Sequence, residues 1–469
     1  MGDFEAGLNT NMLILAFIAV ISCILIHVLI KNIFGNKKKE TLLHETESIV
    51  KDTPEENSTK ETAVTENRTT SSKSKKRGQW KGKTDYSHQW LVKNLKGHPG
   101  TVLMVDFSPN GKFMAATCDG DRLGILSENH LKLKDVLYGS VILWDIRDLN
   151  QKEHKTLRVN IEFDHASHVA WSPDSKAFIV HTVRENHIVV YKIEKKKDGA
   201  IGSATPVITF DKAHTEDIVG FDISSNGKFM MSCSSKTDMV IWDLKGQQLD
   251  KLDTYLMSTY AAKISPCGRF VVATGFAPDV KVMEVVFTKT GEFKQVAKAF
   301  ELSGHTSGIY DVAFDVDTSH VATISKDGTW KLYHTKIDYV RGESPHVLET
   351  GTYTQCAHPP RIALSPNGEV LAVSVDSSIE FYDTYTGKLY DTVENVYLGP
   401  INYMKFDASG NYIFVCGDRA VRVFVNVCGY FTTIASCTRL LGSKQTSATV
   451  ERLKKTIQEC KETLTKYGK

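Results

Sequence analysis

Histidine, cysteine and acidic residues are the side chains of this 469-residue sequence best suited to chemistry, and their spacing limits what they can do. Nine cysteines are scattered along the chain, with no CxxC pair and no Cys/His spacing of the kind that binds zinc. There is also no G-x-S-x-G motif, no HExxH motif and no phosphate-binding loop. We therefore predict no catalytic, cofactor or metal site. Cys118, Cys233 and Cys416 lie in apolar strand patterns and are interpreted as small buried residues.

Basic side chains gather in one place although the whole chain is nearly neutral, with 57 Lys and Arg against 55 Asp and Glu. The cluster consists of Lys73, Lys75, Lys76, Arg77, Lys81 and Lys83, with Trp80 among them. It suits contact with anionic lipid headgroups or, more weakly, with RNA, where Trp80 would stack on a base. The simpler interpretation is a solvated linker. Residues 31–85 are rich in Lys, Glu, Thr and Ser, so we expect them to form a flexible basic linker.

An apolar run over residues 12–30 predicts a transmembrane anchor, because 19 helical residues span roughly 28 Å. A cleavable signal peptide would begin with basic residues, and none precedes this run. Lys31 and residues 37–39 follow it, so the N-terminus should be lumenal and the rest of the chain cytosolic. The sequons at Asn57 and Asn67 would then stay unglycosylated.

The strands expected to position the remaining polar residues belong to a sequence repeat that begins near residue 97. An apolar strand, a tight turn and two further apolar strands recur seven times over residues 86–428. The turns are centred on Gly111, Ser175, Gly227, Gly268, Ser319, Gly368 and Gly410. A period in the forties with several short strands in each unit is typical of propeller blades, which are stable only in a ring. The sequence thus predicts an all-β, seven-bladed propeller.

Two segments of this region depart from the simple repeat. The first interval is unusually long, and removing residues 123–139 restores it, which indicates an inserted loop in blade one or, equally well, an alternative exon or imperfect gene model. Residues 90–95 precede the first repeat, and we expect this strand to complete the last blade and so remove the exposed sheet edges.

These repeats resemble the WD40 family. Gly97-His98 and Gly304-His305 match its opening dipeptide, with Ala213-His214 a near match, and Trp144-Asp145 and Trp242-Asp243 match its closing dipeptide. The resemblance implies a structural cluster of Asp, His, Ser or Thr, and Trp within a blade. Blade five comes nearest, with His305, Ser325, Asp327 and Tyr333, while Asp121, Asp376 and Asp418 keep the turn Asp and Lys236 puts the blade-three cluster in doubt. The histidines would then be structural residues and not bases.

Longer segments are similar to one particular branch of the WD40 family. They are residues 163–166, 265–271, 278–282, 325–332 and 416–422. This resemblance implies a protein of the endoplasmic-reticulum membrane that takes part in the unfolded-protein response. It also implies association with the stress kinase that phosphorylates translation initiation factor 2.

Residues 447–467 carry apolar side chains at helical heptad spacing: Val450, Leu453, Ile457, Cys460, Leu464 and Tyr467. They predict a short amphipathic helix, docked on the propeller or paired with a partner helix.

Taken together, the sequence favours a non-catalytic, membrane-anchored scaffold that binds proteins. An alternative is a substrate receptor of a cullin ubiquitin ligase, because Trp144, Asp145 and Arg147 resemble the Trp-Asp-x-Arg motif of that class.

Overall fold

The computed structural model describes residues 86–121, 138–149, 151, 153–161 and 163–468. The predicted anchor, the basic linker with residues 73–83, and residues 122–137 of the expected insertion lie outside this description. Met1–Gly82 and Lys83–Lys469 form two separate units, and everything below concerns the second. Among the described residues, no helix has the length and apolar character needed to cross a bilayer.

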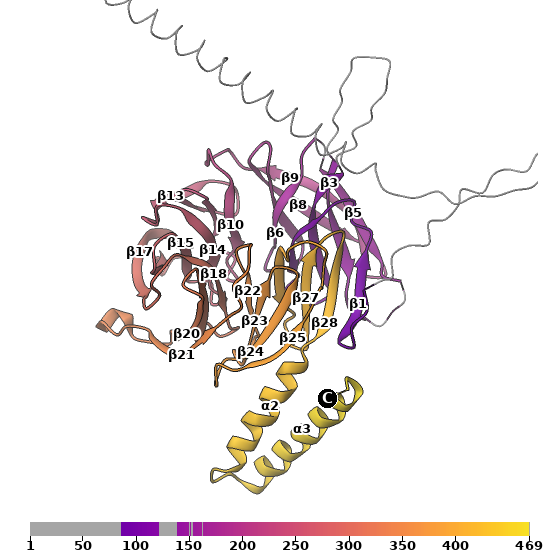
Figure 1. The fold of residues 1–469 in the computed structure, drawn as a ribbon. Helices are drawn as coiled ribbons and strands as arrows, with labels where there is room; N and C mark the ends of the chain where they lie inside the picture. The colour runs from indigo at the N-terminus through magenta and orange to yellow at the C-terminus, as the bar shows by residue number, and fades with distance from the viewer. Residues whose placement is uncertain (1–85, 122–137, 150, 152, 162, 469) are drawn as a thin grey trace, which may run out of the picture. The chain divides into compact units, whose positions relative to one another are not determined.

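The second unit contains seven four-stranded antiparallel sheets (Figure 1). Blade one is β2 (Val102–Phe107), β3 (Phe113–Asp121), β4 (Tyr138–Asp145) and β5 (Thr156–Ile161). Blade two is β6 (Ala166–Trp171), β7 (Ala177–Thr182), β8 (His187–Lys195) and β9 (Ile201–Thr209). Blade three is β10 (Ile218–Ile223), β11 (Met230–Ser234), β12 (Asp238–Trp242) and β13 (Gln248–Asp253).

Blade four is β14 (Thr259–Ile264), β15 (Phe270–Gly275), β16 (Val280–Phe287) and β17 (Phe293–Leu302). Blade five is β18 (Ile309–Phe314), β19 (His320–Ser325), β20 (Thr329–His334) and β21 (His346–Thr352), with the 3-10 turn η1 (Tyr339–Arg341) before β21. Blade six is β22 (Ile362–Leu364), β23 (Val370–Val375), β24 (Ser378–Asp383) and β25 (Leu389–Val393). Blade seven is β26 (Tyr403–Phe406), β27 (Tyr412–Gly417) and β28 (Ala420–Val425), completed by β1 (Leu91–Lys96).

Strand β1 closes the ring, because it pairs with β28 although more than 300 residues separate the two. Trp90 and Leu95 anchor it and are each 1% exposed. The first strands of successive blades contact one another around the whole circuit, from β2 through β6, β10, β14, β18, β22 and β26 and back to β2. The prediction of a seven-bladed propeller is confirmed.

Each of the seven apolar clusters combines side chains of two neighbouring blades. Phe113 of blade one packs with Trp171 and Phe178 of blade two, for example, and Phe414 of blade seven packs with Met114 of blade one. Alternation along the strands gives each blade two apolar faces. Only a neighbour on each side buries both faces, which is the physical reason for closure.

The turn between the first two strands of each blade needs a residue with positive φ. Six of the predicted turn residues hold that position, such as Gly111 at 69° and Ser175 at 57°. In blade five the residue with positive φ is Thr318, with φ of 57°, and not the predicted Ser319. The turn there begins at Asp315, one residue earlier than the repeat alignment suggested. The expected insertion also ends earlier, since Tyr138 and Gly139 belong to β4, where Gly139 pairs with Ile161.

Two helices follow β28, where the sequence predicted one. Helix α2 (Val427–Leu441) begins at Asn426, whose side chain caps Gly429 N, and α3 (Ser447–Lys466) returns along it as an antiparallel hairpin. Helix α2 docks on blade six, with Phe431 stacked on Tyr390 at 5.8 Å. The apolar side of α3 buries Leu453, Cys460 and Leu464. It therefore packs on its own chain.

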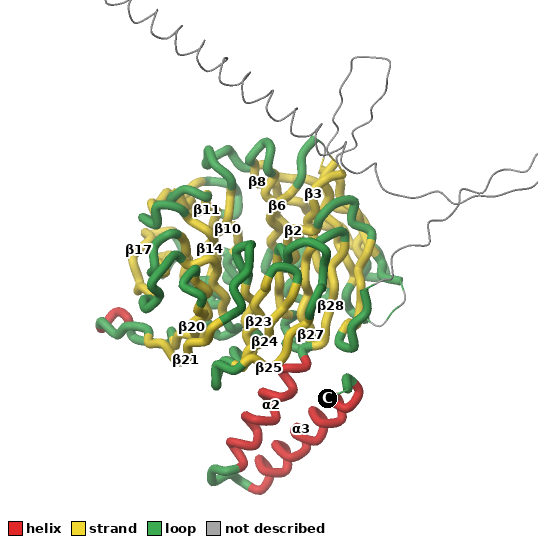
Figure 2. Tube along the Cα trace, viewed as in Figure 1, coloured by secondary structure: helices red, strands yellow, loops and turns green. Residues whose placement is uncertain are grey.

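The loops define two faces of the propeller (Figure 2). The upper face carries the loops that join one blade to the next and those that join second to third strands. The lower face carries the first-to-second and third-to-fourth connections and the helical hairpin α2–α3. Figures 1 and 2 show this hairpin extending from the lower end of the strands.

Candidate functional site

Blade three contains a complete hydrogen-bonded cluster below the upper face. His214 binds Asp238 through Nδ1 and Ser232 Oγ through Nε2 at 2.7 Å, and Trp242 Nε1 donates to the same hydroxyl at 2.8 Å. Burial would raise the pKa of Asp238, but hydrogen bonds from Ser234 and His214 outweigh it and hold the pKa below its ordinary value. Lys236 does not disturb the cluster, because the aspartate lies two residues further on.

Blade five repeats the arrangement with a different hydroxyl from the one predicted. His305 Nδ1 lies 2.9 Å from Asp327 Oδ2, and its Nε2 lies 2.8 Å from Thr323 Oγ1. Ser325 donates instead to Gly308 O at 3.0 Å, and the Tyr333 hydroxyl donates to Ser303 O at 3.1 Å. Thr323 takes the place that we assigned to Ser325, because it matches Ser232 of blade three by strand register: Val321 pairs with Tyr333 as Met230 pairs with Trp242.

Blade one has the histidine and the tryptophan but lacks the hydroxyl. Both ring nitrogens of His98 and Nε1 of Trp144 are buried without a hydrogen-bond partner among the described residues. The position that matches Ser232 by strand register is Ala116, since Met114 pairs with Trp144 as Met230 pairs with Trp242. Burial, helped by Arg158, lowers the pKa of His98 to about 4, so the ring is neutral. The side chain of Asp121 lies outside the described residues.

Blades six and seven use their turn aspartates to hold upper loops. Asp376 Oδ1 accepts from His358 Nδ1 at 2.8 Å, and Asp418 Oδ2 accepts from Leu398 N at 3.1 Å. The side chains of His358 and Asp376 are both largely exposed. These aspartates therefore shape loops, and no predicted site residue is brought into a catalytic arrangement.

Carboxylates of the first strands join blades 1 to 2, 3 to 4 and 5 to 6. Asp106, Asp222 and Asp311 accept from the backbone N–H groups of Trp171 (2.8 Å), Ile264 (3.2 Å) and Ile362 (3.1 Å) in the next blade. Lys263 reaches Asp311 at 2.9 Å and Lys405 reaches Asp106 at 2.6 Å, which adds the junctions 4 to 5 and 7 to 1. This set of residues was not predicted, although Asp or Lys recurs near the end of these strands.

The upper face presents three large apolar side chains on adjacent loops of blade four. Tyr255 is 80% exposed, Met257 78% and Phe276 57%. Tyr255 and Met257 both have positive φ, at 55° and 63°, while Leu256 between them is fully buried. A backbone conformation that L residues rarely adopt thus turns two apolar side chains outward on a firmly anchored loop.

Neighbouring loops brace this surface from three sides. Phe276 N donates to Ser258 O at 2.9 Å, Ser258 Oγ donates to Ser235 O at 3.2 Å, and Tyr255 N donates to Asp253 Oδ1 at 2.7 Å. A side chain at Gly308 of blade five would meet Phe276 O at 3.1 Å, so the next blade also lies close. We call Tyr255, Met257 and Phe276 the blade-four patch. Solvent-exposed aromatic and Met side chains on a rigid support are typical of protein-binding surfaces.

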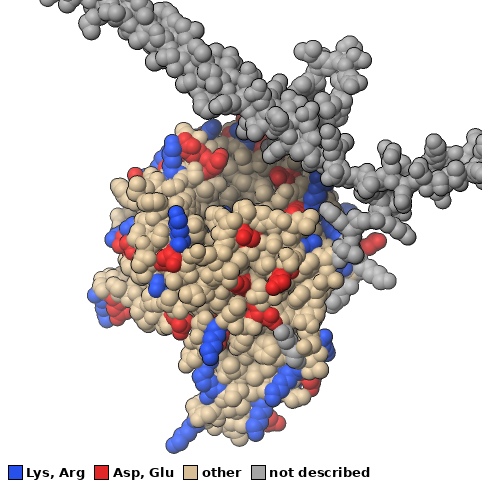
Figure 3. All heavy atoms as spheres, in the orientation of Figure 1, with Lys and Arg blue, Asp and Glu red and all other residues tan. Residues whose placement is uncertain are grey.

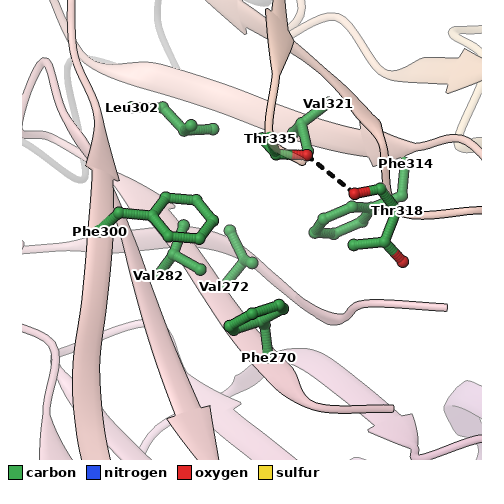
Figure 4. Close-up of a pocket in the computed structure, with 9 residues that line it drawn as sticks. All are labelled: Phe270, Val272, Val282, Phe300, Leu302, Phe314, Thr318, Val321 and Thr335. Carbon is green, nitrogen blue, oxygen red and sulfur yellow. Dashed lines mark hydrogen bonds between the residues drawn. The ribbon is translucent and has the colours of Figure 1, made fainter. Parts of the chain in front are cut away.

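A pocket between blades four and five is lined by Phe270, Phe300 and Phe314 together with aliphatic residues, and its free volume is about 10 Å³ (Figure 4). That is the size of one water molecule in an apolar lining, where water has few partners. Thr335 closes one side by donating to Thr318 O at 2.9 Å. Within the described residues, no group of three or more His, Cys, Asp or Glu side chains could hold a metal ion.

The Trp-Asp-x-Arg residues lie at the lower end of blade one. The Arg147 guanidinium binds Asp145 through Nε at 2.9 Å and through Nη2, and this contact lowers the pKa of Asp145. A ligase adaptor would have to share or displace an ion pair that is already formed.

A closed ring of seven four-stranded blades, with His–Asp–hydroxyl clusters in blades three and five, defines a WD40 β-propeller. The family model for the WD domain, G-beta repeat matches residues 89–123, 204–243 and 296–334. These stretches contain or border the three histidines of blades one, three and five.

Comparison with known proteins shows which WD40 proteins this chain is similar to. The chain is 39% identical over 386 residues to transducin beta-like protein 2 of Homo sapiens, covering 82% of each chain, and 38% identical over 384 residues to the Mus musculus protein. It is 24% identical over 302 residues to a WD repeat-containing protein 3 homolog of Dictyostelium discoideum, covering 62% of this chain and 30% of that protein. The chain belongs to the transducin beta-like protein 2 family.

Proposed function

We propose that this protein is a scaffold held at the endoplasmic-reticulum membrane by residues 12–30, with its propeller in the cytosol. The observation that carries the scaffold function is the blade-four patch. Exposed apolar side chains lower the solubility of a protein. In this loop, Tyr255 and Met257 also adopt a strained backbone conformation that turns their side chains outward. A partner that covers the patch would gain the free energy of burying two aromatic rings and a thioether.

The partner that we propose is the stress kinase that phosphorylates translation initiation factor 2. Support comes from the family relationship and from the anchor predicted by sequence, which would hold the propeller at the membrane where such a kinase resides. The upper face also carries the acidic segment with Asp211, Glu216 and Asp217. A basic, apolar segment of the partner would complement both features.

The test is a binding measurement between the purified propeller and the cytosolic part of the kinase. Replacing Tyr255, Met257 and Phe276 together by Ser should weaken binding at least tenfold, since aromatic anchors dominate interface energies. The matched control replaces exposed apolar residues of the lower face, Leu244, Val316 and Val340, by Ser. The control should bind as the native protein does, and both variants should keep its melting temperature.

Equal affinity of the native protein and the patch variant would exclude the blade-four patch as the binding surface for the kinase. Proximity labelling from the full chain would then show whether the kinase is a partner through another surface. The anchor is tested separately, since alkaline extraction should leave the full chain in the membrane pellet and release a variant that lacks residues 12–30.

A further inference from the structure

We propose that the helical hairpin α2–α3 is a second membrane contact, in which basic side chains of α3 lie on anionic phospholipid headgroups. This inference rests on the proposed anchor for its setting, but its chemistry stands on the described residues alone. It assigns the lower face of the propeller to the bilayer and leaves the upper face open to partners.

The first observation is where the chain enters the propeller. Strand β1 runs from the lower face to the upper one, because it pairs antiparallel with β28 and leads into the loop at Gly97. Tyr86 packs in the same apolar cluster as Leu464 and Tyr467 at the end of α3. A side chain at Gly468 would meet Gln89 Oε1 at 2.9 Å. The entry point of the N-terminal segment and the hairpin are thus neighbours on one face.

The second observation is the charge of the hairpin. Helix α3 exposes Arg452, Lys454, Lys455, Lys461 and Lys466 against Glu451, Glu459 and Glu462. Lys454 and Lys461 are seven residues apart and share one flank of the helix. Glu451 lies three residues before Lys454, and Lys455 pairs with Glu459 at 3.8 Å, so the positive charge of α3 is the excess of its five basic residues over its three acidic ones. Figure 3 shows Lys and Arg along the hairpin. In the described loops of the upper face, acidic side chains outnumber basic ones.

The third observation is that the hairpin is firmly attached, so its charges move with the propeller. Ser436 Oγ donates to Glu369 Oε1 at 2.7 Å, Arg439 lies 3.8 Å from the Tyr385 ring centre, and Asn426 Nδ2 donates to Gly410 O at 2.8 Å. A basic surface fixed beside Tyr86, where the described chain begins, would orient the ring on the bilayer. Attraction of each Lys or Arg to an anionic leaflet adds up and falls with salt.

An anionic membrane is favoured over RNA as the occupant. RNA binding without a base-paired target relies on exposed aromatic rings that stack on bases. The aromatic residues of the hairpin are Tyr430, Phe431 and Tyr467, and all three are packed against the apolar core cluster. The basic residues of α3 therefore offer charge without stacking surfaces, which suits headgroups.

The test uses residues 83–469, which form a compact unit of their own and lack the apolar segment. The fragment should co-sediment with phosphatidylcholine vesicles that contain phosphatidylserine, and it should dissociate from them at high salt. It should not bind vesicles of phosphatidylcholine alone. Changing Lys454, Lys455, Lys461 and Lys466 to Gln should weaken binding at least about tenfold. The matched control changes four exposed upper-face residues, Arg184, Lys212, Lys236 and Lys326, to Gln and should bind as the native fragment does.

Circular dichroism of both variants should match the native fragment, because all eight side chains are exposed. The proposal is overturned if the native fragment ignores phosphatidylserine, if the α3 variant binds as well as the control, or if the fragment binds single-stranded RNA and not the vesicles. Because the fragment has no anchor, these outcomes do not depend on the extraction experiment that tests residues 12–30.

Discussion

Lys405 Nζ lies 2.6 Å from Asp106 Oδ1, and this contact joins blade seven to blade one across 299 positions of sequence. Asp106 also accepts from Trp171 N, so one carboxylate links three consecutive blades. Burial alone would lower the pKa of Lys405, but Asp106 outweighs it and raises the pKa, which keeps the ammonium charged. The ring is therefore closed twice, by β1 on the outside and by an ion pair on the inside.

We predict that Lys405→Met lowers the free energy of unfolding by about 1–3 kcal/mol, because Asp106 is left without its cation in a confined place. Urea denaturation of residues 83–469 measures this. Lys245→Met, at an exposed turn of blade three, is the control and should change stability by less than about 0.5 kcal/mol. Equal effects of the two substitutions would show that the pair does not contribute to closure.

Asp222 should make stability depend on pH. Burial raises its pKa to about 6, Lys405 lowers it, and Asp106 raises it. Since the native state holds this proton more tightly than the unfolded chain, the contribution of Asp222 is favourable below its ordinary pKa and is lost as pH rises through 6. Asp222→Asn should flatten the stability profile between pH 4 and 6. In Lys405→Met the same loss should extend to higher pH, because the folded-state pKa of Asp222 rises further without the lysine. An unchanged profile in both variants would contradict the assignment.

The Ser232 hydroxyl at the centre of the blade-three cluster should contribute to the free energy of unfolding. Ser232→Ala leaves His214 Nε2 and Trp242 Nε1 without a partner, so we expect a loss of about 1–3 kcal/mol. The reverse change in blade one, Ala116→Ser, should stabilise by about 1 kcal/mol, since it offers a hydroxyl to His98 and Trp144. Thermal melts of the two variants decide this. Destabilisation by Ala116→Ser would mean that the site has no room for the oxygen.

Deleting residues 90–95 should abolish cooperative unfolding of the propeller. The deletion removes Trp90 and Leu95 from two apolar clusters and exposes the edge of β28. Differential scanning calorimetry of the shortened fragment measures the loss. A transition like that of the native fragment would show that three strands of blade seven are sufficient.

The proposed orientation makes a prediction about glycosylation. Asn57 and Asn67 would lie in the cytosol, so glycosidase treatment of the protein from cells should leave its electrophoretic mobility unchanged. Ala substitutions of both residues provide the unglycosylated standard. A shift on treatment that the double substitution removes would reverse the orientation.

Patterns that repeat along the chain were visible in the sequence, because each blade carries its own turn and its own apolar alternation. They predicted seven blades, the closing strand at 90–95, the burial of Cys118, Cys233 and Cys416, and a helix near the C-terminus. Helix α2 was not predicted, because Val427–Leu441 has one charged residue, three Thr and one Gly, so its amphipathic pattern is weak. It forms where blade six offers an apolar surface.

Contacts between residues far apart in the sequence could be determined only from the tertiary structure. Thr323 and Ser325 lie on the same side of β19, so which of them meets His305 depends on the register of the strands, and β18 shifts register between Ile309 and Asp311. Lys405 and Asp106 meet only because seven blades complete the circle. Tyr255 and Met257 look like loop residues of no special kind until Leu256 is seen buried between them. A repeat pattern determines the unit and its period, whereas contacts between units depend on register and closure, which arise only when the whole ring has formed.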